Sequence, residues 1–390
     1  MVPHRVGGRQ AHPAGVVESE QMLTRLFIDN YRCFVNFEFK PSRRQLIFGP
    51  NGSGKSSFLD AILFLRQFIT QGNPINDYFL VSQRTRWQNN SKMTFELEPS
   101  LGAGHYRYAL VIEAADEPAK ARIALEAVYL AGKPIYEFVK GEVRLYNDQF
   151  ELKNTFEFDS SRSALAPMVP RPDNQTLAAF KTWAASLYCF RINPYSNVMI
   201  SRSESEQLYA KVDLSNYASW YRHLLQSLPE ESTALWESLR ETIGGFRTLQ
   251  FEPVGENNSV LAAKFHRNGN VARYYFHELS DGQRCLICLY SILHFLVAKG
   301  DTVIIDEPEN FISLREIQPW LMAVTDAIEN GNGQVLLISH HPEIINQWAP
   351  AHGVEFVRDE NGPTRVAPFP NDSEAVLPPS ELIARGWERE

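Results

Sequence analysis

The sequence has none of the long apolar runs that mark a membrane protein. Among its 390 residues, no apolar stretch reaches the roughly 18 residues of a membrane span, so no membrane part is expected. Its four cysteines are too few and too scattered for a disulfide framework, which is typical of a reducing compartment. Together these absences predict a cytoplasmic protein.

Signals for nucleic-acid binding and for long coiled coils are also missing. The formal net charge is −8 and there is no lysine- and arginine-rich block, so any DNA-binding surface would have to form locally in the folded chain. The candidates are scattered basic residues: Arg84, Arg86, Arg162, Arg171, Lys181, Arg191 and Arg202. No heptad repeat runs through the middle of the chain, which excludes the long arms of a DNA-tethering protein.

Two smaller features carry no predicted function. Residues 1–21 lack apolar periodicity and the apolar core of a signal peptide, so they are expected to be a disordered leader, with Met22 as an alternative start. Cys285 and Cys288 form a C-x-x-C pattern within an apolar segment that has no second Cys or His pair nearby. We therefore expect both thiols in the core rather than on a metal.

The clearest motif is a glycine-rich run between an apolar strand, expected over 45–48, and an apolar helix, expected over 58–68. The run reads Gly49-Pro50-Asn51-Gly52-Ser53-Gly54-Lys55-Ser56-Ser57. In this G-x-x-x-x-G-K-[ST] pattern, glycines turn backbone N–H groups toward phosphates and a helix N-terminus adds positive charge. Lys55 is placed to reach the terminal phosphates and Ser56 to ligate Mg²⁺. The sequence therefore predicts a nucleoside triphosphate site.

Two carboxylates and a histidine follow two further apolar segments. Residues 301–306 read as a buried strand that ends in Asp306-Glu307 and is stopped by a proline. Asp306 is suited to hold Mg²⁺, and Glu307 to orient and deprotonate an attacking water. The strand expected over 334–338 leads to His340, which could hydrogen-bond the γ-phosphate or that water.

A fourth segment predicts a second anion site. Ser280 and Gln283 have the spacing of a capping box at the start of an apolar helix over 284–298, and a helix N-terminus favours anions. Taken singly, these motifs have ordinary explanations: a helix cap for Ser280 and Gln283, a turn at the end of a strand for Asp306-Glu307, and a satisfied polar residue for His340. A separate alternative is that His340, His341 and Glu343 are metal ligands. Their order along the chain favours the nucleotide interpretation.

In this order the four motifs resemble those of the ABC-type ATPase superfamily, in the branch that contains SMC, Rad50 and RecF. Leu279-Ser280-Asp281-Gly282-Gln283 resembles the signature motif, Asp306-Glu307 the Walker B motif, and His340 the switch histidine. The segments 187–194 and 307–310 are similar to those of compact bacterial AAA/ABC-like ATPases related to the overcoming-lysogenisation-defect family. Those proteins often sit beside a nuclease-like or TOPRIM-like partner in anti-phage systems.

The resemblance implies an α/β fold: a P-loop NTPase head of ABC type with a mixed sheet core, flanking helices, an antiparallel β subdomain and an inserted helical lobe. It divides the chain into a leader (1–21), an N-terminal half of the head (22–130), an inserted α/β lobe (131–260), a C-terminal half (261–368) and a tail (369–390). The catalytic residues it implies are Lys55, Glu307 and His340. In this family Ser280, Gly282 and Gln283 contact the γ-phosphate bound to the opposite head, which implies an ATP-closed homodimer.

Other positions match the family less completely. Ile28-Asp29-Asn30-Tyr31-Arg32-Cys33-Phe34 is similar to the N-F-R-S-F element of the first strand, so Tyr31 or Arg32 is expected to touch the nucleotide. The candidates for the glutamine that helps to hold the metal in this family are Gln83 and Gln88, with Gln83 favoured, and a neutral surface role is the alternative for each. Residues 311–315 lack the aspartate that usually crosses the dimer interface after Walker B.

The remaining segments predict elements without assigned chemistry. Strands are expected over 93–98, 106–112 and 127–130, and helices over 177–188 and 219–244, with Trp183, Trp220, Tyr221, Trp236 and Leu239 on stripes that are more typical of a core than of base stacking. A hairpin is expected over 354–367 around an Asn-Gly turn, and a short helix over 381–385 capped by Gly386.

The predicted function is ATP hydrolysis in a nucleotide switch that controls a nuclease-like or TOPRIM-like partner in anti-phage defence. The alternative is a RecF-like repair ATPase that clamps DNA itself. The predicted cofactors are ATP and Mg²⁺, and the predicted partners are a second copy of the chain and that effector, with DNA as a further candidate.

Overall fold

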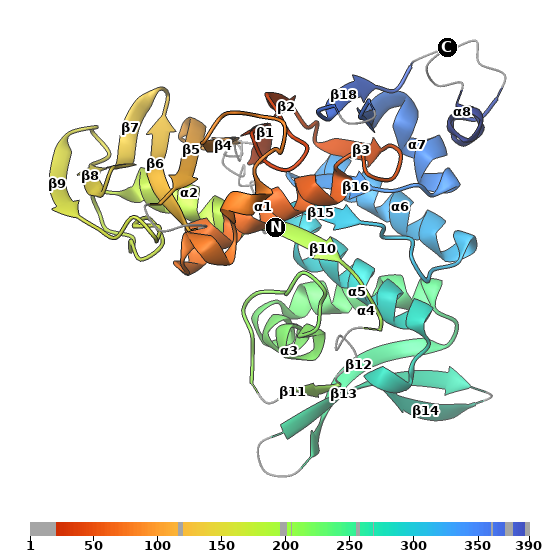
Figure 1. Cartoon of the computed structure of the whole chain (residues 1–390). Helices are drawn as coiled ribbons and strands as arrows, with labels where there is room; N and C mark the ends of the chain where they lie inside the picture. Colours follow the sequence, from red (N-terminus) through yellow and green to blue (C-terminus); the bar gives the residue numbers. More distant parts are fainter. Residues whose placement is uncertain are drawn as a thin grey trace, which may run out of the picture.

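Three β-sheets organise the part of the chain that the computed structural model describes (Figure 1), which comprises residues 21–115, 120–195, 201–203, 205–254, 258–267, 269–359, 362–370 and 377–386. The predicted leader, apart from its last residue, lies outside these residues, and so does part of the predicted Asn-Gly turn. Within the described part, no helix is both long and apolar enough to span a membrane.

The central sheet has six strands, of which the first five are parallel and the last is antiparallel. In spatial order they are β10 (Leu187–Arg191), β15 (Thr302–Asp306), β16 (Gln334–Ile338), β3 (Arg44–Phe48), β17 (Gly353–Val357) and β18 (Arg365–Pro368). The apolar runs that predicted strands before the glycine-rich loop, before Asp306-Glu307 and before His340 are confirmed as β3, β15 and β16. They are buried on both faces, as is typical of parallel sheets.

Helices cover both faces of the central sheet. Alternate strand residues belong to two separate hydrophobic clusters, with Ile304 and Leu336 on one face and Val303 and Leu337 on the other. The first cluster includes residues of α1 (Lys55–Gln71). The second includes residues of α5 (Asp281–Phe295), α6 (Leu314–Asn330) and α7 (Pro342–His352).

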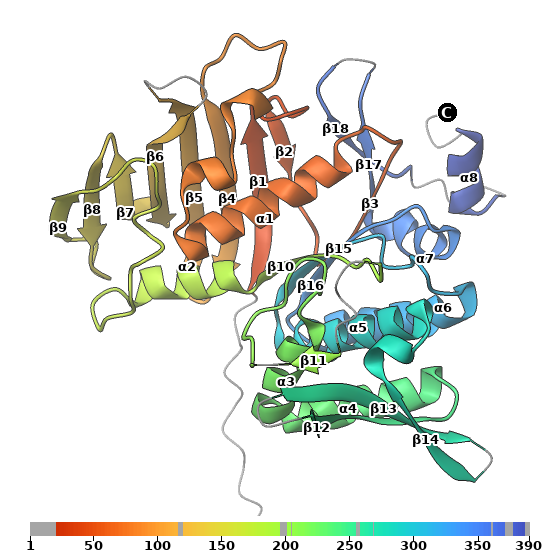
Figure 2. The same ribbon diagram turned by 60° about the horizontal axis from the view of Figure 1, so that its bottom comes forward.

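An antiparallel sheet of eight strands packs on the other side of α1, and Figure 2 shows α1 lying across it. Its order is β2 (Phe37–Phe39), β1 (Met22–Asp29), β4 (Met93–Leu101), β5 (Gly104–Ala114), β6 (Ala121–Leu130), β7 (Lys133–Val139), β8 (Glu142–Tyr146) and β9 (Leu152–Glu157). The three strands predicted here are confirmed as parts of β4, β5 and β6, each longer than expected.

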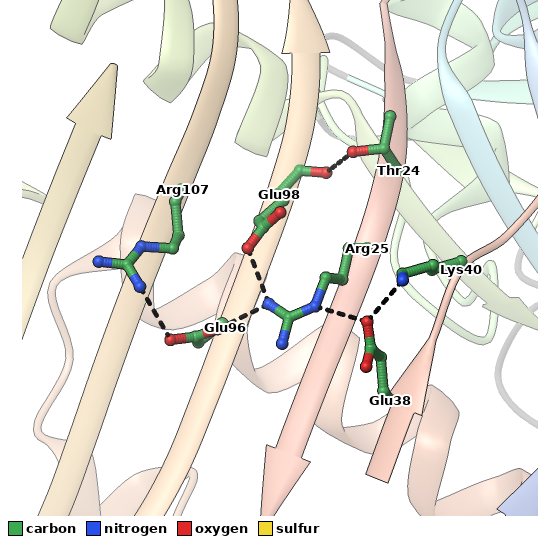
Figure 3. A network of polar contacts seen from close by, with 7 residues as sticks. All are labelled: Thr24, Arg25, Glu38, Lys40, Glu96, Glu98 and Arg107. Atoms are coloured by element: carbon green, nitrogen blue, oxygen red, sulfur yellow. Dashed lines mark hydrogen bonds and ion pairs between the residues drawn. The ribbon is translucent and has the colours of Figure 1, made fainter. Parts of the chain in front are cut away.

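The outer face of the eight-stranded sheet is charged (Figure 3). On β4, Phe95 and Leu97 face the cluster that contains α1, so alternation places Glu96 and Glu98 on the opposite face. Arg25 on β1 donates through its Nη1 to both Glu96 Oε2 and Glu98 Oε1, each at 2.7 Å. Cross-strand ion pairs of this kind stabilise the polar face of the sheet, while its apolar face packs against α1.

The third sheet and its helices lie beside α5. The sheet comprises β11 (Arg202–Ser203), β12 (Phe246–Val254), β13 (Asn258–Arg267) and β14 (Asn270–Tyr275), and all three others pair with β13. The remaining helices are α2 (Gln175–Ala185), α3 (Tyr217–Ser227), α4 (Pro229–Thr242) and α8 (Pro379–Arg385), with single 3₁₀ turns at Ile75–Asp77, Val81–Gln83, Phe276–Glu278 and Val297–Lys299. Residues 131–260 thus contribute strands to all three sheets.

Two predicted helices were wrong in extent. The helix expected over 177–188 ends at Ala185, because the apolar residues from Leu187 pair with β15 as the parallel strand β10. The helix expected over 219–244 is two helices, because Leu228 precedes Pro229 and a residue before proline is disfavoured in the helical conformation. The aromatic stripe on these segments is core, as predicted, since Trp183, Trp220 and Tyr221 are fully buried.

The two elements predicted near the C-terminus are confirmed. The strands of the expected hairpin are β17 and β18, which pair antiparallel from Val354 with Pro368 to Val357 with Arg365. The short helix is α8, and Gly386 caps it with a φ of 72°, a left-handed conformation that glycine adopts at little cost.

Candidate functional site

The carboxyl ends of five parallel strands meet along one edge of the central sheet. There β10 ends at Arg191, β15 at Asp306, β16 leads to His340, β3 leads into the glycine-rich loop, and β17 leads to Arg358. Ligands of open parallel sheets bind at this edge. A cavity of about 710 Å³ opens here, and it is lined by Arg32, Cys33, Asn51, Gly52, Gly54, Lys55, Ser56, Ser57, Ser82, Gln83, Arg84, Arg86, Trp87, Arg191, Ile192, Asp306, Glu307, Asn310, His340 and Arg358.

The glycine-rich loop leaves the N-terminus of α1 open toward this cavity. Gly54 is the N-cap residue with a φ of 106°, and no side chain caps the helix. A Cβ at this position would lie 2.9 Å from both Cys33 Sγ and Thr364 Oγ1, so only glycine fits. The uncapped N–H groups of a helix start form an anion site, and the loop therefore fits a phosphate group.

Lys55 lies over the same loop. Its ammonium donates to the carbonyl oxygens of Gly49 at 2.6 Å and Pro50 at 3.0 Å. Burial lowers the pKa of Lys55, and the carboxylates of Asp306 and Glu307 oppose that shift. The lysine thus sits between the loop and the two carboxylates, where a phosphate held by the loop would face both.

Asp306 is held by Arg191, a residue that the sequence suggested as part of a DNA-binding surface and as a member of the segment 187–194, without a role at the nucleotide site. Arg191 Nε donates to Asp306 Oδ2 at 3.0 Å, and the two residues are register partners on β10 and β15. Burial raises the pKa of Asp306, and Arg191 opposes that shift. Arg191 also lies 3.8 Å from Asp60, which accepts from Arg32 at 2.6 Å. Charges of alternating sign therefore run from Arg32, which follows β1, through Asp60 and Arg191 to Asp306.

Glu307 projects from a strained turn. Its φ is 51°, which is uncommon for a residue with a Cβ, and its N–H donates to Ile338 O at 2.8 Å. Asn310 Nδ2 donates to Glu307 Oε2 at 2.7 Å, and Ser339 Oγ donates to Glu309 Oε1 at the same distance. These contacts fix the exposed carboxylate of Glu307 at the cavity.

His340 completes this side of the cavity. Burial lowers its pKa, and the positive charge of Lys55 lowers it further, so the imidazole is neutral at pH 7. His341, its neighbour, instead accepts from Glu343 N at 3.2 Å and caps α7. Among the described residues, no group of three or more His, Cys, Asp or Glu side chains is arranged to hold a metal ion, which leaves the alternative of His340, His341 and Glu343 as ligands without support.

The structure separates the candidates that the sequence left open near the first strand. Arg32 lines the cavity, whereas Tyr31 is fully buried against Phe79 and Phe95. Gln83 lines the cavity and Gln88 is not among the lining residues. The side chain of Gln83 accepts from Leu80 N at 3.0 Å, so in this structure it closes its own 3₁₀ turn. Ser53 of the loop is buried and is not among the lining residues.

The signature-like segment lies outside this cavity. Ser280 caps α5 as predicted: its Oγ accepts from Gln283 N at 3.3 Å, and its N–H donates to Gln283 Oε1 at 3.1 Å. Neither residue lines the cavity, and neither does Gly282. A Cβ on Gly282 would meet the carbonyl oxygen of Phe311 at 2.8 Å, so the start of α5 packs on the loop that follows Glu307.

Among the lining residues, Ser82, Trp87 and Arg358 were not predicted to belong to the site. Asn310 lies in the segment 307–310 that resembles compact ATPases, but the sequence predicted no role for it. For Arg191 a usable signal existed. An apolar run that ends in a charged residue, Leu187 to Arg191, has the same form as the run that ends at Asp306.

A phosphate-binding loop at the carboxyl edge of a mixed sheet, facing two carboxylates, defines a P-loop nucleoside-triphosphatase fold of α/β class. Family models agree. Residues 46–346 match the family described as "AAA domain, putative AbiEii toxin, Type IV TA system", and residues 23–66 match the P-loop containing region of an AAA domain. The chain belongs to this AAA family.

Solved structures extend the fold assignment to SMC heads. The chain is similar to an SMC head bound to the C-terminal winged-helix domain of ScpA, with a TM-score of 0.56 and 13% identity over 88% of this chain and 96% of that one. An Smc head with a coiled coil and joint from Pyrococcus yayanosii gives 0.55 and 9%, over 94% and 99%. One from Pyrococcus furiosus gives 0.54 and 11%, over 89% and 96%. No curated protein matches. The predicted ABC-type head fold is confirmed.

Proposed function

We propose that this chain binds and hydrolyses ATP and acts as a nucleotide-dependent switch in bacterial anti-phage defence. The observation that carries the proposal is the cavity at the sheet edge, where an uncapped helix start, Lys55, Asp306 and Glu307 face one another. The family match to an AbiEii-type AAA domain supports a role in defence.

Each residue of the cavity then has a task. The loop N–H groups and Lys55 bind the phosphates, and Arg32 and Ser57 border the same space. Ser56 and Asp306 would hold Mg²⁺, with Gln83 as a third candidate ligand, and the ion would neutralise charge on the phosphates. Glu307, fixed by Asn310, orients the attacking water and takes its proton.

His340 acts beside Glu307 as a neutral hydrogen-bonding group. Its lowered pKa keeps it uncharged at pH 7, so it adds no fixed charge next to Lys55. A neutral imidazole both donates and accepts, which suits a contact with the γ-phosphate or with the attacking water. Because His340 follows β16, a hydrogen bond from His340 to the terminal phosphate would couple the presence of that phosphate to this strand.

A second copy of the chain supplies the other half of the proposed site. Ser280, Gly282 and Gln283 form a helix start that does not line the cavity of their own chain. In a head-to-head homodimer they would reach the phosphates held by the partner copy. The SMC head structures that this chain is similar to include complexes with ScpA, which supports a head that also recruits a different protein. For this chain we propose a nuclease-like effector.

ATP hydrolysis by the purified chain tests the proposal, measured with and without double-stranded DNA. We expect activity that falls about 100-fold or more in Lys55→Ala, because the charge that meets the phosphates is removed. Lys40→Ala, on the outer face of the eight-stranded sheet, is the control and should not change it. Stimulation by DNA would favour the DNA-clamping alternative. A chain that neither binds nor hydrolyses ATP would contradict the proposal.

A further inference from the structure

An exposed tryptophan stands at the mouth of the cavity. The Trp87 side chain is 45% exposed, and among the described lining residues it is the only aromatic one besides the imidazole of His340. Burying an indole is favourable, so an exposed one in a largely polar cavity calls for a partner. No role for Trp87 follows from the phosphate chemistry described above.

Trp87 is held firmly in place. Its neighbour Thr85 is buried, and Thr85 Oγ1 donates to Phe34 O at 3.3 Å. Gln88 N donates to Thr85 O at 3.2 Å, which closes a turn with Trp87 at its third position. Thr85 therefore anchors the segment two residues before the indole, and the turn that Thr85 closes with Gln88 contains the indole.

Arg358 forms a second flat surface next to this ring. The guanidinium carbon of Arg358 lies 5.5 Å from the centroid of the Trp87 ring. Arg358 Nε donates to Gly362 O at 2.8 Å, and its Nη1 approaches Gly52 O at 3.4 Å. Arg358 thus contacts both the tryptophan and Gly52 of the phosphate-binding loop, which would bind the phosphates of a nucleotide.

Two sets of residues that line the cavity differ in chemistry. Asp306, Glu307 and Arg191 suit phosphates, a metal ion and water. Trp87 and Arg358 pair an aromatic ring with a guanidinium plane, and both kinds of plane stack on nucleobases. Because Arg358 bridges Trp87 to the loop, a triphosphate that occupies the loop places the rest of the nucleotide near this pair.

We propose that Trp87, braced by Arg358, is the platform on which the nucleobase of the bound nucleotide stacks. The proposal rests on the function proposed above and adds the residue that holds the base. Stacking of one base on an aromatic side chain corresponds to a roughly 5- to 150-fold change in Kd. The tryptophan would therefore set much of the affinity for a nucleotide and none of the affinity for its phosphates alone.

Calorimetric titration with ATP and with inorganic tripolyphosphate tests this directly. Trp87→Ala should weaken ATP binding about 10-fold or more and leave tripolyphosphate binding unchanged, and Trp87→Phe should retain most of the ATP affinity. Leu80→Ala is the matched control, because Leu80 lies in the same segment and is also 45% exposed but does not line the cavity. It should change neither affinity.

Two results would overturn the platform. If Trp87→Ala binds ATP as tightly as the wild type, the indole does not meet the base. If the variant loses ATP and tripolyphosphate affinity equally, Trp87 supports the loop and not the base. Failure of the proposed function looks different, because the unmodified chain would then bind neither ligand. Indole fluorescence that is quenched by ATP in the wild type, and not in Trp87→Phe, would add independent support.

Discussion

Two helix starts in this chain, those of α1 and α5, are candidates to bind an anion through their N–H groups, and they differ in how they are capped. The start of α1 has glycine at the N-cap in a left-handed conformation and no capping side chain. The start of α5 has Ser280 at the N-cap, with a capping box closed in both directions by Gln283. The N–H groups at the start of α1 have no capping side chain, whereas the start of α5 is capped by side chains of its own chain.

This difference in capping explains which helix start can bind a phosphate alone and which one depends on a second copy of the chain. The α1 start has its own cation in Lys55 and faces the cavity, so it can bind a phosphate without a contribution from another chain. The α5 start carries Asp281 in its first turn, paired with Arg284, and is already capped. Such a start attracts a free anion weakly. In the proposed dimer it receives a phosphate that the partner copy has already bound.

The largest expected effect comes from closing the open start. Gly54→Ala forces a Cβ to within 2.9 Å of Cys33 Sγ and Thr364 Oγ1 while φ is 106°. We expect a loss of about 2 kcal/mol of unfolding free energy and, because the loop must shift, a loss of ATP affinity of about 100-fold. Denaturant unfolding and nucleotide titration measure the two.

Gly132→Ala, in the turn between β6 and β7 and away from the cavity, is the matched control for that change. Gly132 also has a positive φ, 78°, but no atom lies within 4 Å of a Cβ built there. It should cost only the conformational strain of about 1 kcal/mol. Equal losses in both variants would show that the close approach of Cys33 and Thr364 to the loop does not matter.

A smaller effect is expected at the capped start. Ser280→Ala removes the side-chain acceptor for Gln283 N, which should cost about 1 kcal/mol. Hydrolysis should fall more than this loss of stability explains, because in the proposed dimer Ser280 also contacts the phosphates bound by the partner copy. The control is Asp148→Ala, since Asp148 accepts from Gln175 N and Thr176 N at the start of the remote helix α2.

Thermal unfolding and ATP hydrolysis of both variants separate the two roles. Both should lower the unfolding midpoint by about 2 °C, and only Ser280→Ala should lower hydrolysis. A Ser280→Ala variant that hydrolyses ATP at the rate of Asp148→Ala would restrict Ser280 to capping, and the comparison between the two helix starts would lose its functional meaning.

Much of the site could be read from the sequence, because each motif imposes a local demand. Gly54 is required by backbone conformation, Ser280 and Gln283 by the geometry of a capping box, and Asp306 by its place at the end of an apolar strand. Such demands act over a few residues and leave a pattern that a sequence displays.

The missed parts depend on contacts between distant segments. The run from Leu187 fits a helix or a strand equally, and only β15 beside it decides for a strand. The role of Arg191 follows from that pairing. Trp87 and Arg358 meet because β17 lies next to β3, which the order of strands along the chain does not reveal. Both are consequences of sheet order rather than of local pattern.

The most direct test of the account is the ATP-dependent assembly of Glu307→Gln, measured by size-exclusion chromatography with light scattering. This change keeps the cavity and removes the group that takes the proton, so the bound state should persist. The account predicts a monomer without ATP and a dimer with it. Adding Ser280→Arg should prevent the dimer, whereas Ser227→Arg, at an exposed serine of α3, should not. A chain that stays monomeric with ATP, or a dimer that survives Ser280→Arg, would contradict it.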